Sequence, residues 1–108
     1  MKMREHFKGE VSFSDLKIDE LLTIFTENSV YTLEVIGHND FIVSGGWFDQ
    51  NGLSPYRTGI EGATWGYGDI FPNIVAAAGM RIKFKNGITT GRIKSIELKK
   101  AMAWSFLS

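Results

Sequence analysis

The sequence has no cysteine and only two prolines among its 108 residues. Without cysteine the chain can form neither a disulfide framework nor a thiolate metal site, and small secreted domains usually depend on one of these. The absence favours a reducing compartment. We therefore expect a cytoplasmic protein.

Long apolar runs are also missing. No stretch approaches the ~18 consecutive apolar residues of a membrane span. Residues 1–10 carry charges throughout, unlike the apolar segment of a signal peptide. We therefore expect a soluble protein that does not associate with membranes.

The chain has no excess of either charge, because twelve Lys and Arg residues balance twelve Asp and Glu residues. The whole molecule thus offers no long-range attraction to nucleic acid or to an acidic membrane surface. The charges are nevertheless segregated: residues 10–50 carry eight acids against one base, and residues 79–100 carry seven bases against one acid. Segregation of this kind favours contact between complementary surfaces of two copies, so we expect a homo-oligomer.

What the chain does contain is 44% hydrophobic and 13% aromatic residues, which is typical of a folded globular protein. A chain of this length can build one compact core, so we expect a single β-rich domain spanning residues 1–108. The pattern predicts a mainly β fold, a small antiparallel β-barrel or rolled sheet of about four to six strands with one short N-terminal α-helix. An α+β two-layer fold is the alternative.

The N-terminal helix is predicted from helical spacing. The apolar residues from Ile18 to Phe25 follow an i, i+3, i+4, i+7 pattern, and Ser14 is a suitable N-cap. From Val30 the period changes to two, which predicts strands over 30–36 and 41–48 joined by a turn. A weaker strand follows over 56–63, interrupted by two glycines, while residues 74–78 fit either a helical turn or a strand.

The strongest local signal is a hairpin that turns at Asn86-Gly87, since Asn-Gly supplies the positive φ angles of a type I′ turn. With this pair at the centre of the turn, Phe84 lies opposite Thr89 and Arg81 lies opposite Arg92. The alternation gives the hairpin an apolar face of Met80, Ile82, Phe84 and Ile93, and a cationic face of Arg81, Lys83, Lys85 and Arg92. Because like charges directly opposite one another are destabilising, we expect an acidic group close to this face.

The chain after this hairpin carries two further predictions. Strict alternation beyond Ile93 would send Ile96 and Leu98 to the opposite side of the sheet, so we predict a bulge near Lys94-Ser95 that restores the phase. Residues 101–108 are too apolar for a free terminus. We expect them to dock on the domain or on a partner.

Two features are candidates for a binding surface. The first is the segment from Gly45 to Phe71, where glycines and aromatic residues interleave, and where we assign Trp47, Trp65 and Tyr67 to a possible ligand or partner surface. The alternative is that these glycines permit tight bends while the aromatic rings fill the core. Two or more rings exposed together would favour a site.

The second feature is the cationic face of the last hairpin. Basic side chains near aromatic rings bind single-stranded nucleic acid by phosphate contacts and base stacking. The balanced overall charge disfavours this interpretation. The alternatives are a solvated edge that lysines protect against strand addition, and a surface complementary to the acidic half of the chain in an oligomer.

Signs of catalysis are sparse. The chain has no Walker loop, nucleophile elbow or zinc-ligand spacing, and Phe71 replaces the third glycine that a dinucleotide loop would need after Gly66 and Gly68. His6 and His38 have no recognisable partners for a metal site. We therefore assign no catalytic residue, no cofactor and no metal ligand.

No motif in the sequence specifies a chemistry or a ligand, so three classes of function remain. The leading hypothesis is a non-catalytic binding or interaction module that forms a homo-oligomer, with its small-molecule ligand unspecified. The second is a single-stranded nucleic-acid binder that uses the cationic hairpin face. The third is a small enzyme, which would need a pocket that holds Asp49 or Asp69 beside exposed aromatic rings.

Overall fold

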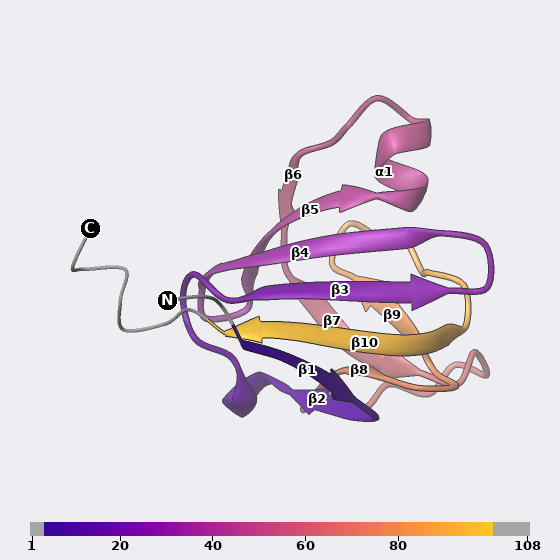
Figure 1. Ribbon diagram of the computed structural model, residues 1–108. Coiled ribbons are helices and arrows are strands. Elements are labelled where there is room, and N and C mark those ends of the chain that lie inside the picture. Colours follow the sequence, from indigo (N-terminus) through magenta and orange to yellow (C-terminus); the bar gives the residue numbers. More distant parts are fainter. Residues whose placement is uncertain (1–3, 101–108) are drawn as a thin grey trace.

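A computed structural model describes residues 4–100 of the chain, with the backbone alone for residues 4–8. In this range the fold is mainly β (Figure 1). Its strands are β1 (Arg4–Lys8), β2 (Glu10–Ser12), β3 (Leu21–Thr26), β4 (Val30–Gly37), β5 (Asp40–Gly45), β6 (Tyr56–Thr58), β7 (Ile60–Thr64), β8 (Ile74–Ala77), β9 (Arg81–Phe84) and β10 (Ile93–Lys100). A single 3-10 turn, η1 (Phe13–Asp15), and one short helix, α1 (Gly46–Gln50), complete the described elements.

Six of the strands form one antiparallel sheet in the order β1-β10-β3-β4-β5-β6. The pairs β2-β8 and β7-β9 form two further antiparallel ladders. No sheet in the described range closes into a barrel, because β1 and β6 remain the two edges of the main sheet. The mainly β, antiparallel fold is thus confirmed. A closed barrel is not formed among the described residues, and the ten strands there outnumber the four to six expected.

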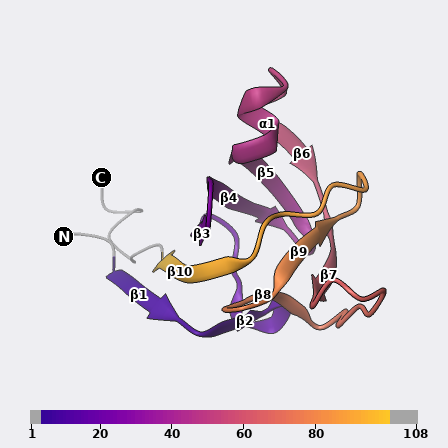
Figure 2. The same cartoon turned by 90° about the vertical axis from the view of Figure 1, so that its right-hand side faces the viewer.

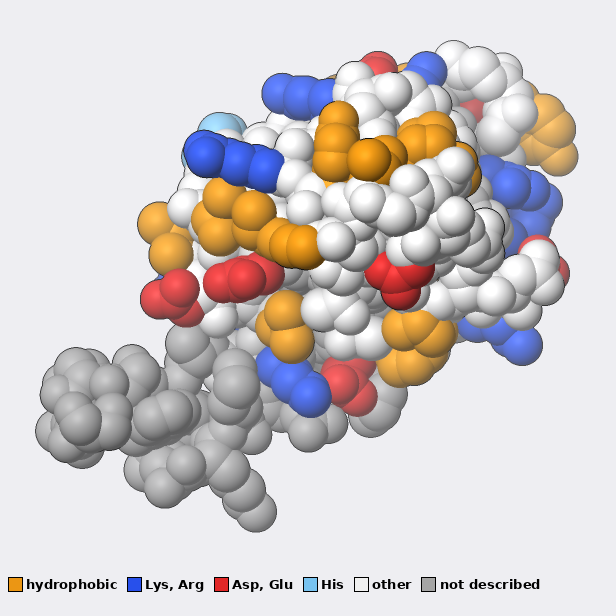
Figure 3. Space-filling view, turned by 90° about the horizontal axis from the view of Figure 1, so that it is seen from above, with side chains coloured by type: hydrophobic (Ala, Val, Ile, Leu, Met, Phe, Trp, Pro, Cys, Tyr) orange, Lys and Arg blue, Asp and Glu red, His pale blue; other side chains and the backbone are white. Residues whose placement is uncertain are grey.

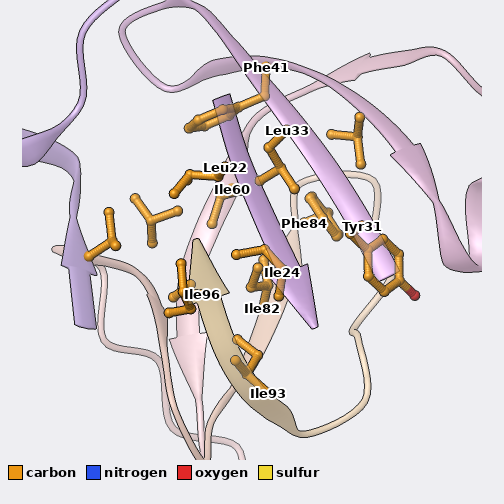
Figure 4. Close-up of a cluster of buried hydrophobic side chains, with 14 of the residues drawn as sticks. Leu22, Ile24, Tyr31, Leu33, Phe41, Ile60, Ile82, Phe84, Ile93 and Ile96 are labelled. Carbon is orange, nitrogen blue, oxygen red and sulfur yellow. The ribbon is translucent and has the colours of Figure 1, made fainter. Parts of the chain in front are cut away.

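The core lies where the main sheet and the two ladders face one another. Figure 4 shows side chains from β3, β4 and β10 pointing toward those of β7 and β9. Four central side chains are each at most 1% exposed: Leu22, Leu33, Ile60 and Ile82. Each buried side chain of this size contributes about 1.5–3 kcal/mol relative to an exposed one. The alternating burial along the strands is what assigns one face of each strand to this core.

The predicted N-terminal helix is wrong. Residues 21–26 form strand β3, which pairs with β4 on one side and with β10 on the other. Alternate residues Leu22, Ile24 and Thr26 are buried, so the segment follows period two. The apolar spacing fits a helix equally well, and pairing with two neighbours decides between them. The 3-10 turn η1 has its N-cap at Ser12, two residues before the predicted Ser14, and Ser12 N–H donates to Asp15 Oδ2 at 2.9 Å.

The hairpin predicted at 30–36 and 41–48 is confirmed as β4 and β5, but its second strand stops at Gly45. Residues 46–50 turn into α1, which carries Phe48 back over the sheet. Phe48 is fully buried and packs edge-on against Phe84, with ring centroids 5.3 Å apart. The weak strand at 56–63 is also confirmed, as β6 and β7, and residues 74–77 form strand β8.

The C-terminal hairpin turns at the predicted place with a different turn. Gly87 N–H donates to Phe84 O at 3.0 Å, and only Gly87 of the Asn-Gly pair has a positive φ, +95°. The connection is therefore a three-residue loop with glycine in the left-handed position, and the type I′ assignment is wrong. Next to the turn, Lys83 rather than Phe84 pairs with Thr89, so the register is shifted there by one residue. The shift does not extend along the whole hairpin, because Ile93 N–H donates to the carbonyl of Met80 at 2.8 Å. No ladder pairing of Arg81 with Arg92 is formed among the described residues.

The two faces of the hairpin are as predicted despite this shift. Met80, Ile82, Phe84 and Ile93 are all at most 3% exposed, whereas the basic residues are partly or fully exposed. The predicted bulge is also confirmed, because the pairing of β10 with β3 shifts between Ile93 and Ser95. The shift keeps Ile93, Ile96 and Leu98 buried together.

Residues 101–108, for which docking is predicted, lie outside the described residues. Between residues 4 and 100 no helix has the length and apolar character needed to cross a bilayer.

Candidate functional site

A cleft of about 430 Å³ lies between the loop that follows β7 and the outer face of the C-terminal hairpin. In Figure 1 this loop is at the right-hand end of the molecule, and Figure 2 shows it beside β7, β8 and β9. The cleft is lined by residues 64–70 on the loop side and by Arg81, Lys83, Thr89 and Arg92 on the hairpin side. We call it the cationic cleft.

Strand alternation places the basic residues in the cationic cleft. Ile82 and Phe84 of β9 point into the core with no exposed surface, so Arg81 and Lys83 point outward. Arg81 Nη1 donates to the carbonyl of Thr90 at 3.3 Å, and Arg92 Nη1 donates to the carbonyl of Gly79 at 3.3 Å. These two bonds orient the guanidinium groups across the hairpin. Since a guanidinium has several N–H donors, both groups retain donors for a ligand.

The positive charge of the cleft is not neutralised by ion pairs in the described part of the chain. The ion pairs found between residues 9 and 100 join Arg57 to Asp40, Lys99 to Glu97 and Lys100 to Glu20. None of them includes Arg81, Lys83 or Arg92. Asp69 lines the same cleft, but none of the ion pairs found among the described residues joins it to the basic side chains.

Asp69, however, is engaged by its own loop. Its carboxylate accepts hydrogen bonds from the Thr64 hydroxyl at 3.1 Å, from Trp65 N–H at 3.2 Å and from Tyr67 N–H at 3.1 Å. The Thr64 hydroxyl in turn accepts a bond from Gly66 N–H at 2.9 Å. The N–H groups of Trp65, Gly66 and Tyr67 are therefore occupied within the loop. The charged donors that an anion in the cleft would meet are the basic side chains.

The pKa of Asp69 argues against a role as a catalytic acid. Partial burial alone would raise the pKa, but hydrogen bonds from Trp65 N–H, Tyr67 N–H and the Thr64 hydroxyl outweigh it and hold the pKa below its usual range. Asp69 does lie in a pocket beside exposed rings, as the enzyme hypothesis requires. A general acid needs a raised pKa, and Asp69 has the opposite.

Asp49, the other candidate acid, is exposed on α1 and lies outside the cleft. The Ser54 hydroxyl and Gly45 N–H lower its pKa, the latter through a hydrogen bond of 2.9 Å. Its interactions therefore fix the start of α1. They do not make it an acid catalyst.

The three aromatic residues assigned from the sequence lie in two different environments. Trp65 is 44% exposed and Tyr67 is 86% exposed, and both line the cationic cleft. Trp47 is partly buried on α1 and packs edge-on against Phe48 with centroids 5.4 Å apart. Two of the three rings are thus exposed together, and the third belongs to the core.

Gly62 allows the loop to reach this position. A Cβ at Gly62 would lie 2.5 Å from the carbonyl oxygen of Phe71, and the residue has a φ of +152°. The close approach lets Phe71 and Ala63 exchange two backbone hydrogen bonds, of 2.9 and 3.3 Å. The loop 65–70 is therefore closed at its base like a small hairpin.

The structure brings together five of the seven residues assigned from the sequence. Arg81, Lys83, Arg92, Trp65 and Tyr67 line the cationic cleft. Lys85 lies outside it, in the exposed hairpin loop where its N–H donates to the carbonyl of Gly59. Sequence reasoning missed Thr64, whose hydroxyl organises the loop. The available signal was a Thr five residues before an Asp across two glycines, which is a turn-forming combination.

Other features between residues 9 and 100 offer less chemistry. A second groove of about 370 Å³ is bordered by Phe13, Leu16, Ile18 and His38 and is mostly apolar. In this part of the chain no group of three or more His, Asp or Glu side chains is arranged to hold a metal ion.

Comparison with known proteins adds no further constraint, because no family model matches the chain and no curated protein or solved structure matches it significantly.

Proposed function

We propose that the protein is a non-catalytic binding module that holds an anionic ligand in the cationic cleft. The observation that carries this proposal is the convergence of Arg81, Lys83 and Arg92 on one cleft without an ion-pair partner between residues 9 and 100. Crowding of like charges is unfavourable for folding. It is compensated when an anion binds among them.

The attraction must be local, because the chain as a whole carries no net charge. Figure 3 shows Lys and Arg side chains at the right-hand end of the molecule and in further separate groups elsewhere on the face in view. A short-range site of this kind binds through direct hydrogen bonds to guanidinium and ammonium groups. Its affinity should fall with salt but persist at moderate ionic strength.

Calorimetric titration with inorganic pyrophosphate at low and moderate salt tests the proposal. We expect saturable binding, and we expect the double variant Arg81→Gln, Arg92→Gln to weaken it by about tenfold or more, because a hydrogen bond to a charged group contributes about 1.5–3 kcal/mol. The matched control is Lys85→Gln, which removes an exposed charge from the same hairpin outside the cleft. Absence of binding at low salt, or equal loss in the control, would refute the proposal.

A further inference from the structure

Exposed apolar side chains are concentrated beside the cationic cleft. Seven large hydrophobic residues between positions 9 and 100 are exposed, and four of them lie on the loop after β7: Trp65, Tyr67, Ile70 and Phe71. Tyr67 is 86% exposed and can add little to the core. Clustering of this kind marks an interaction site, whereas single exposed apolar residues are ordinary.

The loop holds its two rings in a defined arrangement. The Thr64 hydroxyl and the Asp69 carboxylate bind the N–H groups of Trp65, Gly66 and Tyr67, so the backbone that carries both rings is fixed. The Trp65 ring also lies against Gly79, where an added Cβ would be 3.4 Å from Cζ3. The backbone is therefore preorganised, and binding would cost little further ordering.

We infer that the anionic ligand is a single-stranded nucleic acid, whose phosphates contact Arg81, Lys83 and Arg92 while a base stacks on Trp65 or Tyr67. This inference rests on the proposed function. The cleft has aromatic rings on one wall and basic side chains on the other, so a ligand that carries both a planar group and an anionic group fits it. Aromatic rings next to basic side chains bind bases of any sequence, since every base has a π-face.

The shape of the site favours a flexible strand over a membrane surface. Arg81 and Lys83 are half-buried in the cleft wall, and Arg81 lies near the loop, 3.5 Å through Nε from a Cβ built on Gly66. A strand can enter the cleft and reach these groups. A flat anionic bilayer would meet the loop first. The bases of a single strand are also unpaired and free to stack, unlike those of a duplex.

Fluorescence anisotropy with a short fluorescein-labelled oligothymidylate, compared with an abasic strand of the same length, tests the inference. We expect the oligothymidylate to bind about tenfold more tightly than the abasic strand. The double variant Trp65→Ala, Tyr67→Ala should remove this preference while retaining binding of the abasic strand. Arg81→Gln, Arg92→Gln should weaken both strands, and Lys85→Gln should change neither.

The outcomes separate the two proposals. Equal affinity for both strands together with pyrophosphate binding would leave the anion site standing and overturn the nucleic-acid inference. So would binding to phosphatidylserine vesicles without binding to either strand. Failure to bind pyrophosphate and both strands would overturn the anion site as well. Because both rings are exposed, the aromatic variant should keep the wild-type circular dichroism spectrum, which verifies that a loss of preference is not a loss of fold.

Discussion

The Thr64 hydroxyl donates a hydrogen bond to Asp69 Oδ1 at 3.1 Å and so ties the end of β7 to the loop that lines the cationic cleft. Thr64 is 5% exposed and anchored in a strand, whereas Asp69 lies at the far side of the loop. The pair converts a glycine-containing segment into a fixed wall. The Asp69 carboxylate accepts the hydrogen bonds that hold this loop, so we expect the order of the loop to depend on the ionisation of Asp69.

The loop after β7 should become less ordered in acid, because protonated Asp69 accepts these hydrogen bonds less strongly. Because folding lowers the pKa of Asp69, the stabilisation from this carboxylate is complete above its ordinary pKa and is lost as the pH falls through the lowered value. We expect the amide resonances of Trp65 and Tyr67 to shift in an NMR titration, with a midpoint below the ordinary aspartate range. The Asp69→Asn variant should show no such transition. A midpoint at or above the ordinary value would contradict this account.

Substitution of Gly62 should damage both the fold and the site. A Cβ would meet the carbonyl of Phe71, a backbone atom that cannot move without opening the base of the loop. We expect Gly62→Ala to lower the free energy of unfolding by about 1–3 kcal/mol in urea titrations. Gly9→Ala is the control, because a Cβ there has nothing within 4 Å and Gly9 has no positive φ. Equal effects of the two substitutions would show that the close approach is unimportant.

Phe48 should be among the residues whose truncation is most destabilising. It is fully buried and contacts Tyr31, Tyr56 and Phe84 through ring interactions. Phe48→Ala should lower the free energy of unfolding by about 3–5 kcal/mol. Leu53→Ala, at a side chain that is 41% exposed, should cost much less. Denaturant unfolding of both variants measures the contrast, and similar values would contradict the packing of α1.

The turn of the C-terminal hairpin can be tested at two adjacent residues. Gly87 has a φ of +95°, so Gly87→Ala should cost about 1 kcal/mol or more of stability. Asn86 has no positive φ and contributes one exposed hydrogen bond to Ile88 N–H, so Asn86→Ala should cost less. Thermal unfolding of the two variants gives the comparison. Equally large losses would favour a type I′ turn, in which both positions need a positive φ.

The homo-oligomer expected from charge segregation stays a prediction. Native mass spectrometry over a range of protein concentrations measures the state directly. We expect a population of dimers or larger assemblies that dissociates as salt is raised, because complementary charged surfaces are screened. A monomer at every concentration would remove this expectation and leave the cleft proposal unaffected.

The sequence alone predicts those parts of the fold that depend only on which side chains of a strand face the core. The positions of Ile93, Ile96 and Leu98 alone required a bulge, and the bulge is present. The residues of segment 21–26 satisfy both the helical and the strand period, so the sequence pattern alone does not select the strand, and pairing with β4 and β10 does. The Asn-Gly signal predicts the place of the turn correctly but not its type, and within this turn Lys85 N–H donates to the carbonyl of Gly59, a residue distant in sequence.

In the candidate site too, some features follow from the local sequence and others from tertiary packing. Arg81 and Lys83 were assigned to one face by alternation, and this is a local property that the structure reproduces. Which tryptophan is exposed could not be read locally, because Trp47 and Trp65 both follow glycine-rich stretches. Trp47 is covered because α1 folds onto the sheet, and Trp65 is exposed because its loop turns outward. Burial of this kind is decided by tertiary packing.

The bulge between Ile93 and Ser95 uncouples two requirements that one regular strand could not meet together. On its N-terminal side Arg92 must point to the cleft while Ile93 points to the core, and on its C-terminal side Ile96 and Leu98 must enter the same core. With Lys94 deleted, a regular strand could bury either Ile93 or the pair Ile96 and Leu98, but not all three. The extra residue therefore resets the alternation of side chains, so that the hairpin facing the cleft and the strand β10 can each orient their side chains separately.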